Sequence, residues 1–175
     1  GAPWVSAGGS AYFDLVADAF APLTDTRAIL RSGAYIVHDS GFYRGISPLD
    51  TTRDVAEEQA LLPGMRAYAR VVSLPEPGLA LLDAGKRDVP YDEGLPTPLG
   101  VSPTLGGPEQ PLDGEITALN DQHAFLRPAG TAQLAIGDVV TLGLSHPCTA
   151  FDKWRLIPVV DAATGTVREA VETFF

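Results

Sequence analysis

The chain has 175 residues, of which 45% are hydrophobic and 19% are charged, a composition typical of a folded globular protein and not of a disordered one. Its formal net charge of −10 argues against nucleic acid or an anionic membrane as a partner, because both require a basic surface. It has no apolar run of about 18 residues that could form a transmembrane helix, and it has no signal-peptide pattern. Its single cysteine cannot form an internal disulfide. We therefore expect a cytoplasmic protein.

The first 27 residues predict one strand–helix unit. WVSAGGS (4–10) has the pattern of a short strand that ends in a glycine loop. Phe13, Val16 and Phe20 then recur at helical spacing. One such unit is part of a repeating α/β architecture and cannot stand alone. We therefore place a domain boundary between residues 27 and 28.

Residues 28–175 predict a mainly β domain. The hydrophobic pattern there has a period of two, and turn signals such as PEPG and AATG recur at close intervals. This favours an antiparallel β-barrel or sandwich. The segment 89–111 is rich in proline and glycine and predicts a long loop. The predicted strands cover residues 29–43, 65–74, 78–85, 115–120, 123–128, 138–144, 154–161 and 166–175.

The stretch SHPCTAFDKW places His146 two residues before Cys148, the only cysteine. On an extended backbone, alternate side chains point to the same side, and Pro147 favours that conformation. Imidazole and thiolate together favour zinc, and two protein ligands leave positions open for water or substrate, as in a catalytic metal site. The alternative is that Cys148 is a small buried hydrophobic residue and His146 a hydrogen-bonded loop residue.

A second candidate site lies in SAGGS, where Gly8, Gly9 and Ser10 stand between the predicted strand and helix. Exposed backbone N–H groups at such a turn can bind a phosphate, although a plain turn has the same sequence pattern. Tyr35, on the predicted strand 29–43, could donate its phenol to the same phosphate or pack in the core. His38 and Asp39 are adjacent, so we do not expect them to pair with each other.

Five motifs in this order, SAGGS, LRSGAYIVHDSGFY, ALLDAGKRDV, LNDQHAFL and SHPCTAFDKW, resemble the C-terminal part of the D-serine dehydratase and D-threonine aldolase-like family. The resemblance is to the branch of bacterial amino acid deaminases and covers residues 4–175. It implies a fold-type III enzyme that uses pyridoxal phosphate (PLP). Its alanine racemase-like TIM-type barrel would end with residues 1–27, and residues 28–175 would be its C-terminal β domain.

The resemblance also implies site residues and partners. The PLP phosphate would bind at Gly8, Gly9 and Ser10, with Tyr35 as a further donor, and zinc or another divalent metal would bind at His146 and Cys148. The substrate would be a β-hydroxy D-amino acid such as D-serine or D-threonine, and the enzyme would be a homodimer. The metal would bind near the substrate β-hydroxyl, and Cys148 favours the dehydratase branch over the aldolases.

The chain departs from the family in one large respect. The family's cofactor lysine belongs to an early barrel strand, and the only lysines here, Lys86 and Lys153, have a different context. We therefore expect the chain to be a C-terminal fragment that is inactive without the missing N-terminal barrel. The rival interpretation is a stand-alone β-barrel that binds a partner protein, in which His146 and Cys148 are structural.

Overall fold

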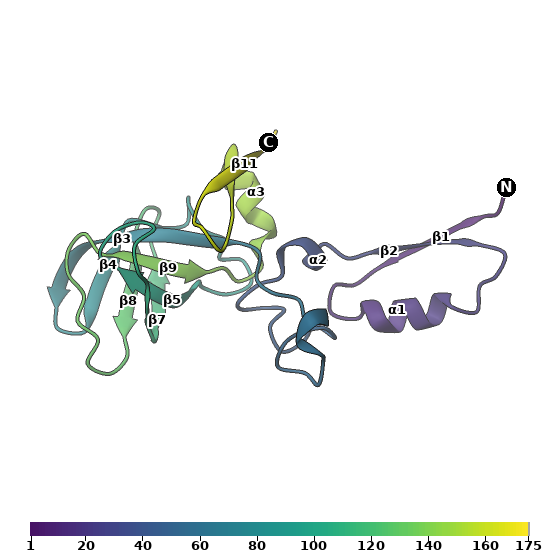
Figure 1. Ribbon diagram of the computed structural model, residues 1–175, viewed down its shortest axis with the longest axis horizontal. Coiled ribbons are helices and arrows are strands. Elements are labelled where there is room, and N and C mark those ends of the chain that lie inside the picture. The colour runs from purple at the N-terminus through teal and green to yellow at the C-terminus, as the bar shows by residue number, and fades with distance from the viewer. Residues whose placement is uncertain (175) are drawn as a thin grey trace.

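The computed structural model describes residues 1–174, which form a small βαβ unit and a larger β domain (Figure 1). The unit consists of strand β1 (Trp4–Gly8), helix α1 (Phe13–Phe20) and strand β2 (Arg27–Arg31). β1 and β2 pair in parallel from Trp4↔Arg27 to Gly8↔Arg31. The predicted strand and helix are confirmed, and the unit continues past residue 28 into β2.

The predicted strand 29–43 is wrong beyond Arg31. β1 ends at Gly8, opposite Arg31, so β2 has no pairing partner beyond that residue. The chain turns at Gly33 into the short helix α2 (Ala34–Val37), which places Tyr35 on a helix and not on a strand. Irregular segments and one 3₁₀ turn, η1 (Glu57–Gln59), then lead into the β domain.

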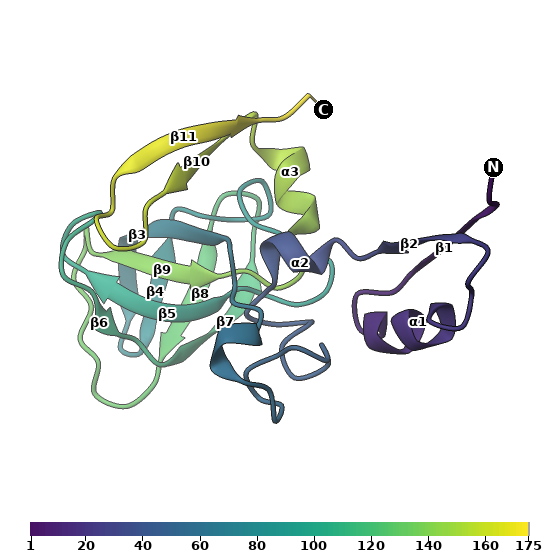
Figure 2. The ribbon, with the colours of Figure 1, turned by 45° about the vertical axis from the view of Figure 1, so that its right-hand side comes forward.

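Seven strands of the β domain form one antiparallel sheet, with the order β6-β5-β9-β3-β4-β8-β7. β5 and β7 also contact each other, so the sheet curls into a half-barrel (Figures 1 and 2). The prediction of a mainly β, antiparallel fold is confirmed. The seven strands are β3 (Arg66–Glu76), β4 (Leu79–Leu82), β5 (Thr97–Ser102), β6 (Gln110–Pro111), β7 (Gly114–Leu119), β8 (Ala124–Pro128) and β9 (Val139–Gly143).

Two of these strands were not expected from the sequence. β5 and β6 lie inside the segment 89–111, which predicts a loop because proline and glycine interrupt its pattern. β5 tolerates Pro98 because its register shifts between Pro98 and Gly100. A proline lacks an N–H and is accommodated at such an irregularity.

The core lies inside the curl of the sheet, where alternate residues of β5 are buried. β9 is buried along its whole length, because β5 and β3 flank it. The side chain of Glu109 also accepts a hydrogen bond from Thr141 of β9. Fully buried aliphatic side chains fill the core, among them Val71, Leu82, Leu112, Leu126, Val140 and Leu142.

The last elements pack beside the half-barrel. A 3₁₀ turn, η2 (Pro147–Thr149), continues into the short helix α3 (Ala150–Lys153). Strands β10 (Leu156–Val160) and β11 (Val167–Glu172) then form a separate antiparallel hairpin, visible above the large sheet in Figure 2. Across residues 1–174, none of the helices has the length and apolar character needed to cross a membrane.

Candidate functional site

The sheet register brings two distant loops together at one end of the half-barrel. Gly143, the last residue of β9, pairs with Arg66 of β3 on one side and Thr97 of β5 on the other. If the antiparallel register with β5 is continued, the loop before β5 runs past the segment after β9. That places Asp92 beside the His146–Cys148 turn, although Asp92 and His146 are 54 positions apart.

The side chains of His146 and Asp92 form a hydrogen bond. His146 Nδ1 lies 2.8 Å from Asp92 Oδ2, and Thr149 Oγ1 donates to Asp92 Oδ1 at 3.2 Å. Burial alone would raise the pKa of the Asp92 carboxyl. Other contacts lower this pKa by more, and the hydrogen bond to His146 is the largest of them. The pKa of Asp92 therefore lies below its usual range, and its carboxylate is ionised at neutral pH.

The prediction that this segment is extended is wrong at His146. His146 has φ 55° and ψ 68°, in the left-handed region, and Pro147 begins the 3₁₀ turn η2. Proline suits the first position of such a helical turn because its fixed φ is already helical. Asp39 Oδ2 accepts a hydrogen bond from the His146 backbone N–H at 3.2 Å, which stabilises the uncommon conformation.

The segment after α2 packs directly on this turn. Ser40 donates its backbone N–H to the Leu144 carbonyl at 2.9 Å. The rings of Phe42 and Tyr43 lie 6.1 and 6.2 Å from the imidazole of His146. Aromatic rings and the Asp39 carboxylate therefore surround His146 on the side facing this segment.

Cys148 is the second predicted metal ligand, and it is exposed. Partial desolvation raises the pKa of its thiol, and the charges of Asp92 and Asp39 raise it further. Cys148 therefore shares the acidic surroundings of His146. Among residues 1–174, no group of three or more His, Cys, Asp and Glu side chains is arranged to hold a metal ion.

The predicted phosphate-binding residues lie at the carboxyl end of the parallel pair. Gly8 ends β1, and Gly9 follows with φ 149°, a backbone conformation suited to glycine. A Cβ at Gly9 would meet only Tyr12, at 3.9 Å, so a ligand could approach the backbone there closely. Ser10 Oγ joins the next loop, through bonds from Ser32 Oγ at 3.3 Å and the Ala34 N–H at 3.5 Å.

Tyr35 follows Ala34 on α2, so the structure brings it to the same pair of loops as Ser10. Its ring packs edge-on against Phe13 at 5.0 Å, and 42% of the residue is exposed. The same short segment continues to Asp39, which contacts His146. Residues 31–44 therefore connect the phosphate-binding candidate to the metal-binding candidate.

His38 and Asp39 do not pair with each other. His38 Nε2 lies 2.8 Å from Asp50 Oδ2, and both side chains are almost completely buried. Burial would raise the pKa of Asp50, but hydrogen bonds from Thr52 and His38 outweigh it and lower that pKa to about 2. The pair attaches the irregular segment around Asp50 to the end of α2.

The two lysines contact each other's segment and not the phosphate loop. Lys153 Nζ donates to the Lys86 carbonyl at 2.8 Å, and both ammonium groups lie within 6 Å of the Tyr91 ring centre, at 5.2 and 5.8 Å. Trp154 Nε1 also donates to the Asp88 carbonyl at 2.7 Å. These bonds hold α3, and with it the His146–Cys148 turn, against the loop that carries Asp92.

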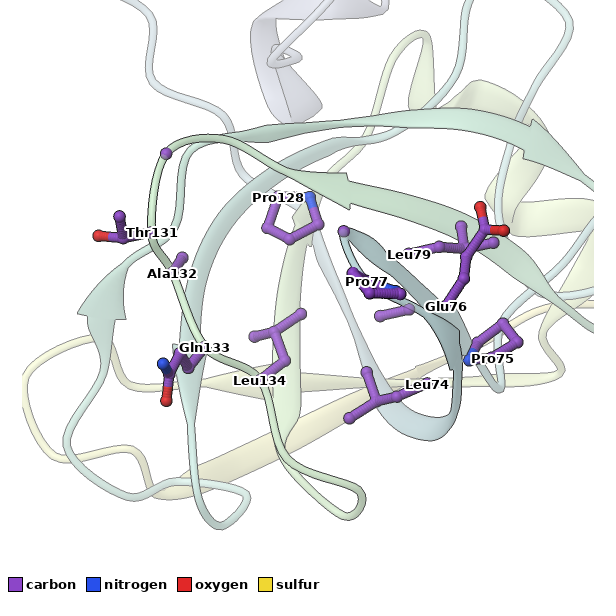
Figure 3. Close-up of a pocket in the computed structure, with 13 residues that line it drawn as sticks. Leu74, Pro75, Glu76, Pro77, Leu79, Pro128, Thr131, Ala132, Gln133 and Leu134 are labelled. Carbon is purple, nitrogen blue, oxygen red and sulfur yellow. The ribbon is translucent and has the colours of Figure 1, made fainter.

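The surface of the β domain has cavities. One of about 730 Å³ lies between the β3–β4 hairpin and residues 128–134, where Leu74, Pro77 and Pro128 line it (Figure 3). It contains none of the predicted site residues. A second, of about 340 Å³, is lined by Leu144 and Ala150, the residues that bracket the His146–Cys148 turn.

Sequence reasoning missed Asp92 and did not assign a role to Asp39. Asp92 lies in a segment without periodicity, and its partner is 54 positions away, so no local pattern marks it. The one signal in the sequence was that Asp92 precedes strand β5, and β5 itself was not predicted. Whether Gly8, Gly9, Ser10, Tyr35, His146 and Cys148 bind ligands stays a prediction.

Residues 64–160 match the family described as "Putative serine dehydratase domain". This is more than half of the chain, and the chain belongs to that family. No curated protein matches the chain.

The solved structures that share the fold include the following three. D-threonine aldolase from Filomicrobium marinum has 24% identity and a TM-score of 0.69, over 96% of this chain and 40% of its own. A histidine-to-alanine mutant of D-threo-3-hydroxyaspartate dehydratase has 20% identity and a TM-score of 0.65, over 99% of this chain and 43% of its own. A cysteine-to-alanine mutant of that dehydratase, in a metal-free form, has 19% identity and a TM-score of 0.61, over 98% and 44%. The chain thus spans less than half the length of these enzymes.

Proposed function

We propose that this chain is the metal-bearing C-terminal part of a PLP-dependent lyase that acts on β-hydroxy D-amino acids. The observation that carries the proposal is the environment of His146. Its Nδ1 bonds to the Asp92 carboxylate at 2.8 Å, which leaves Nε2 free to act as a metal ligand, and a thiol follows two residues later. A histidine whose second nitrogen donates to a carboxylate is the usual arrangement at protein metal sites.

The similar dehydratase supports this interpretation. Its two mutants replace a histidine and a cysteine that are two positions apart, the spacing of His146 and Cys148, and the cysteine mutant is in a metal-free form. Imidazole and thiolate favour zinc among the common divalent metals. His146 and Cys148 would hold the ion, and the remaining positions would be open to water, substrate or residues outside this chain.

The N-terminal unit supports the PLP part of the proposal. In α/β barrels, phosphates bind at the carboxyl ends of the strands, and β1 and β2 end at the loops that Ser10 joins. Open space above Gly9 would allow a phosphate oxygen to approach the backbone. Gly8, Gly9 and Ser10 would bind the phosphate, and the partly exposed phenol of Tyr35 would add a donor.

The substrate class comes from the similar enzymes. D-threonine and D-threo-3-hydroxyaspartate are both D-amino acids with a hydroxyl on the β-carbon. When bound, PLP supplies an electron sink for the α-carbon, and a metal supplies a Lewis acid for the β-hydroxyl. This chain's own residues would orient both groups. The cofactor lysine would come from a barrel outside these 175 residues, in a cytoplasmic homodimer.

The test uses the intact protein, as its gene encodes it. Zinc is measured by mass spectrometry, and D-serine and D-threonine are assayed for pyruvate and ammonia or for glycine and acetaldehyde. We expect His146→Ala and Cys148→Ala to lose zinc and turnover. His123→Ala is the matched control, because it removes an exposed histidine that lies in the turn between β7 and β8 and has no part in the bonds described around His146. Unchanged zinc and turnover in both site variants would refute the proposed role of the pair.

A further inference from the structure

Asp92 uses both of its carboxylate oxygens to bond the segment from His146 to Thr149. Oδ2 lies 2.8 Å from His146 Nδ1, and Oδ1 accepts the Thr149 hydroxyl at 3.2 Å. These two partners stand on either side of Cys148. Asp92 therefore links the residue before the 3₁₀ turn to the residue that ends it.

The chemistry of the bond to His146 determines the state of the imidazole. A neutral imidazole carries its proton on one nitrogen and a lone pair on the other. An ionised carboxylate can only accept, so it favours the tautomer with the proton on Nδ1. His146 Nε2 then keeps the lone pair that a metal requires.

Other contacts fix the position of His146 but leave its tautomer free. Asp39 binds the backbone N–H at 3.2 Å, which fixes the main chain. Phe42 and Tyr43 pack near the ring at 6.1 and 6.2 Å, which restricts its rotation. Asp92 is the one residue among these contacts that bonds to an imidazole nitrogen.

We propose that Asp92 is a positioning residue, which holds His146 with its proton on Nδ1 and its Nε2 free to bind a metal, and that Thr149 holds Asp92 in place. The inference rests on the proposed function, because it assumes that His146 is a ligand. It adds Asp92, a residue that would act on the metal site through His146 and not by contacting the metal.

The first experiment measures the affinity of the intact protein for Zn²⁺ by competition with a chromophoric chelator. We expect Asp92→Ala to bind Zn²⁺ about 10- to 100-fold more weakly, the usual effect of losing such a partner. Asp92→Asn keeps an oxygen acceptor and should retain part of the affinity. Thr149→Val should show a smaller loss. Asp152→Asn is the matched control: it removes one negative charge on α3, and its side chain makes none of the hydrogen bonds described above.

The second experiment reads the tautomer of His146 directly, by long-range ¹H–¹⁵N NMR of the metal-free protein. The wild-type imidazole should carry its proton on Nδ1. Asp92→Ala should populate the other tautomer, the form that neutral histidine favours without a partner. A purely structural role of Asp92 would leave the tautomer unchanged, and thermal unfolding of each variant separates such a role from loss of fold.

The outcomes distinguish the two proposals. If Asp92→Ala keeps both the zinc affinity and the Nδ1–H tautomer, the positioning role is overturned while the metal site stands. If His146→Ala binds Zn²⁺ as tightly as the wild type, the metal role of His146 falls, and the inference falls with it. A tautomer change together with weaker zinc binding in Asp92→Ala, absent in Asp152→Asn, supports the inference.

Discussion

The Asp39 carboxylate and the His146 backbone N–H, 107 positions apart in the sequence, are joined by a hydrogen bond of 3.2 Å. The other oxygen of Asp39 accepts the backbone N–H groups of Gly41, Tyr43 and Arg44 at 3.0, 2.9 and 3.4 Å. One buried side chain therefore shapes the loop after α2 and also fixes the left-handed backbone of a proposed metal ligand.

Asp39→Ala should lower the free energy of unfolding by about 3 kcal/mol, because four partly buried backbone N–H groups lose their shared charged acceptor. Urea unfolding measures this change. Zinc affinity should also fall, since His146 would be free to leave its uncommon conformation. Asp113→Ala, at an exposed aspartate, is the control and should change stability by less than about 0.5 kcal/mol. Equal stability of the two variants would contradict the assigned role of Asp39.

The sequence was sufficient to predict the β domain and most of its hairpins. The β3–β4 and β7–β8 pairs each join neighbouring segments with alternating residues and a short turn, which is local information. β5 could not be predicted, because Pro98 and Gly100 disrupt its pattern and its partner β9 lies about 40 positions away.

The candidate site, like the fold, was predictable where the information is local and not where it depends on distant residues. His146 and Cys148 are close in sequence, so their spacing alone predicts them as a pair of ligands, but the extended backbone assumed for that prediction is wrong. The partners of His146, which are Asp92 and Asp39, reach it through the curled sheet, and only the register of β5 and β9 brings Asp92 there. The left-handed backbone of His146 was also unpredictable, because it depends on a bond to Asp39.

The buried pair of His38 and Asp50 predicts acid sensitivity. The pKa of Asp50 is about 2 in the folded protein, whereas an aspartate in the unfolded chain has its ordinary pKa of 3.8. Because the folded pKa is lower, the stabilisation is complete above pH 3.8 and is lost as the pH falls toward 2. The loss amounts to about 2 kcal/mol. Asp50→Asn should remove this dependence, as measured by urea unfolding at pH 5, 4, 3 and 2.

The control for this experiment is Asp54→Asn, an exposed carboxyl in the same irregular segment. It should keep the acid-dependent loss of the wild type. At pH 7, Asp50→Asn should be less stable than Asp54→Asn, because it removes the ionised partner of buried His38. An identical pH dependence in wild type and Asp50→Asn would show that Asp50 does not have the lowered pKa.

Gly41 lies where the loop after α2 meets the turn that carries His146. A Cβ at Gly41 would overlap the side chain of Ser145 and come within 3.1 Å of its Cα. Ser145 cannot move freely, since its Oγ donates to the Glu93 carbonyl at 2.6 Å and accepts the Phe42 N–H at 3.1 Å. Gly41→Ala should therefore lower the free energy of unfolding by about 1–3 kcal/mol.

Gly33→Ala is a matched control for Gly41→Ala. Gly33 has φ −73° and ψ −27°, which alanine adopts readily, and a Cβ there meets no atom within 4 Å. Its unfolding free energy should stay within about 0.5 kcal/mol of the wild type. If Gly41→Ala is as stable as Gly33→Ala, the packing of the loop on Ser145 is looser than described.

The last prediction concerns PLP and the two lysines of the 175-residue chain. The Lys153 ammonium donates to the Lys86 carbonyl at 2.8 Å, and both ammonium groups lie near the Tyr91 ring. These contacts hold both amines against the Tyr91 ring, in the β domain. The phosphate-binding candidate at Ser10 lies in the separate βαβ unit. We therefore expect PLP to bind this chain weakly and without a covalent link.

After incubation with PLP, dialysis and borohydride reduction, peptide mass spectrometry should find neither lysine modified, whereas the intact protein should carry one modified lysine outside these residues. Stoichiometric modification of Lys86 or Lys153 that survives dialysis would mean that the chain contains its own cofactor lysine, and the proposed dependence on a separate barrel would be wrong.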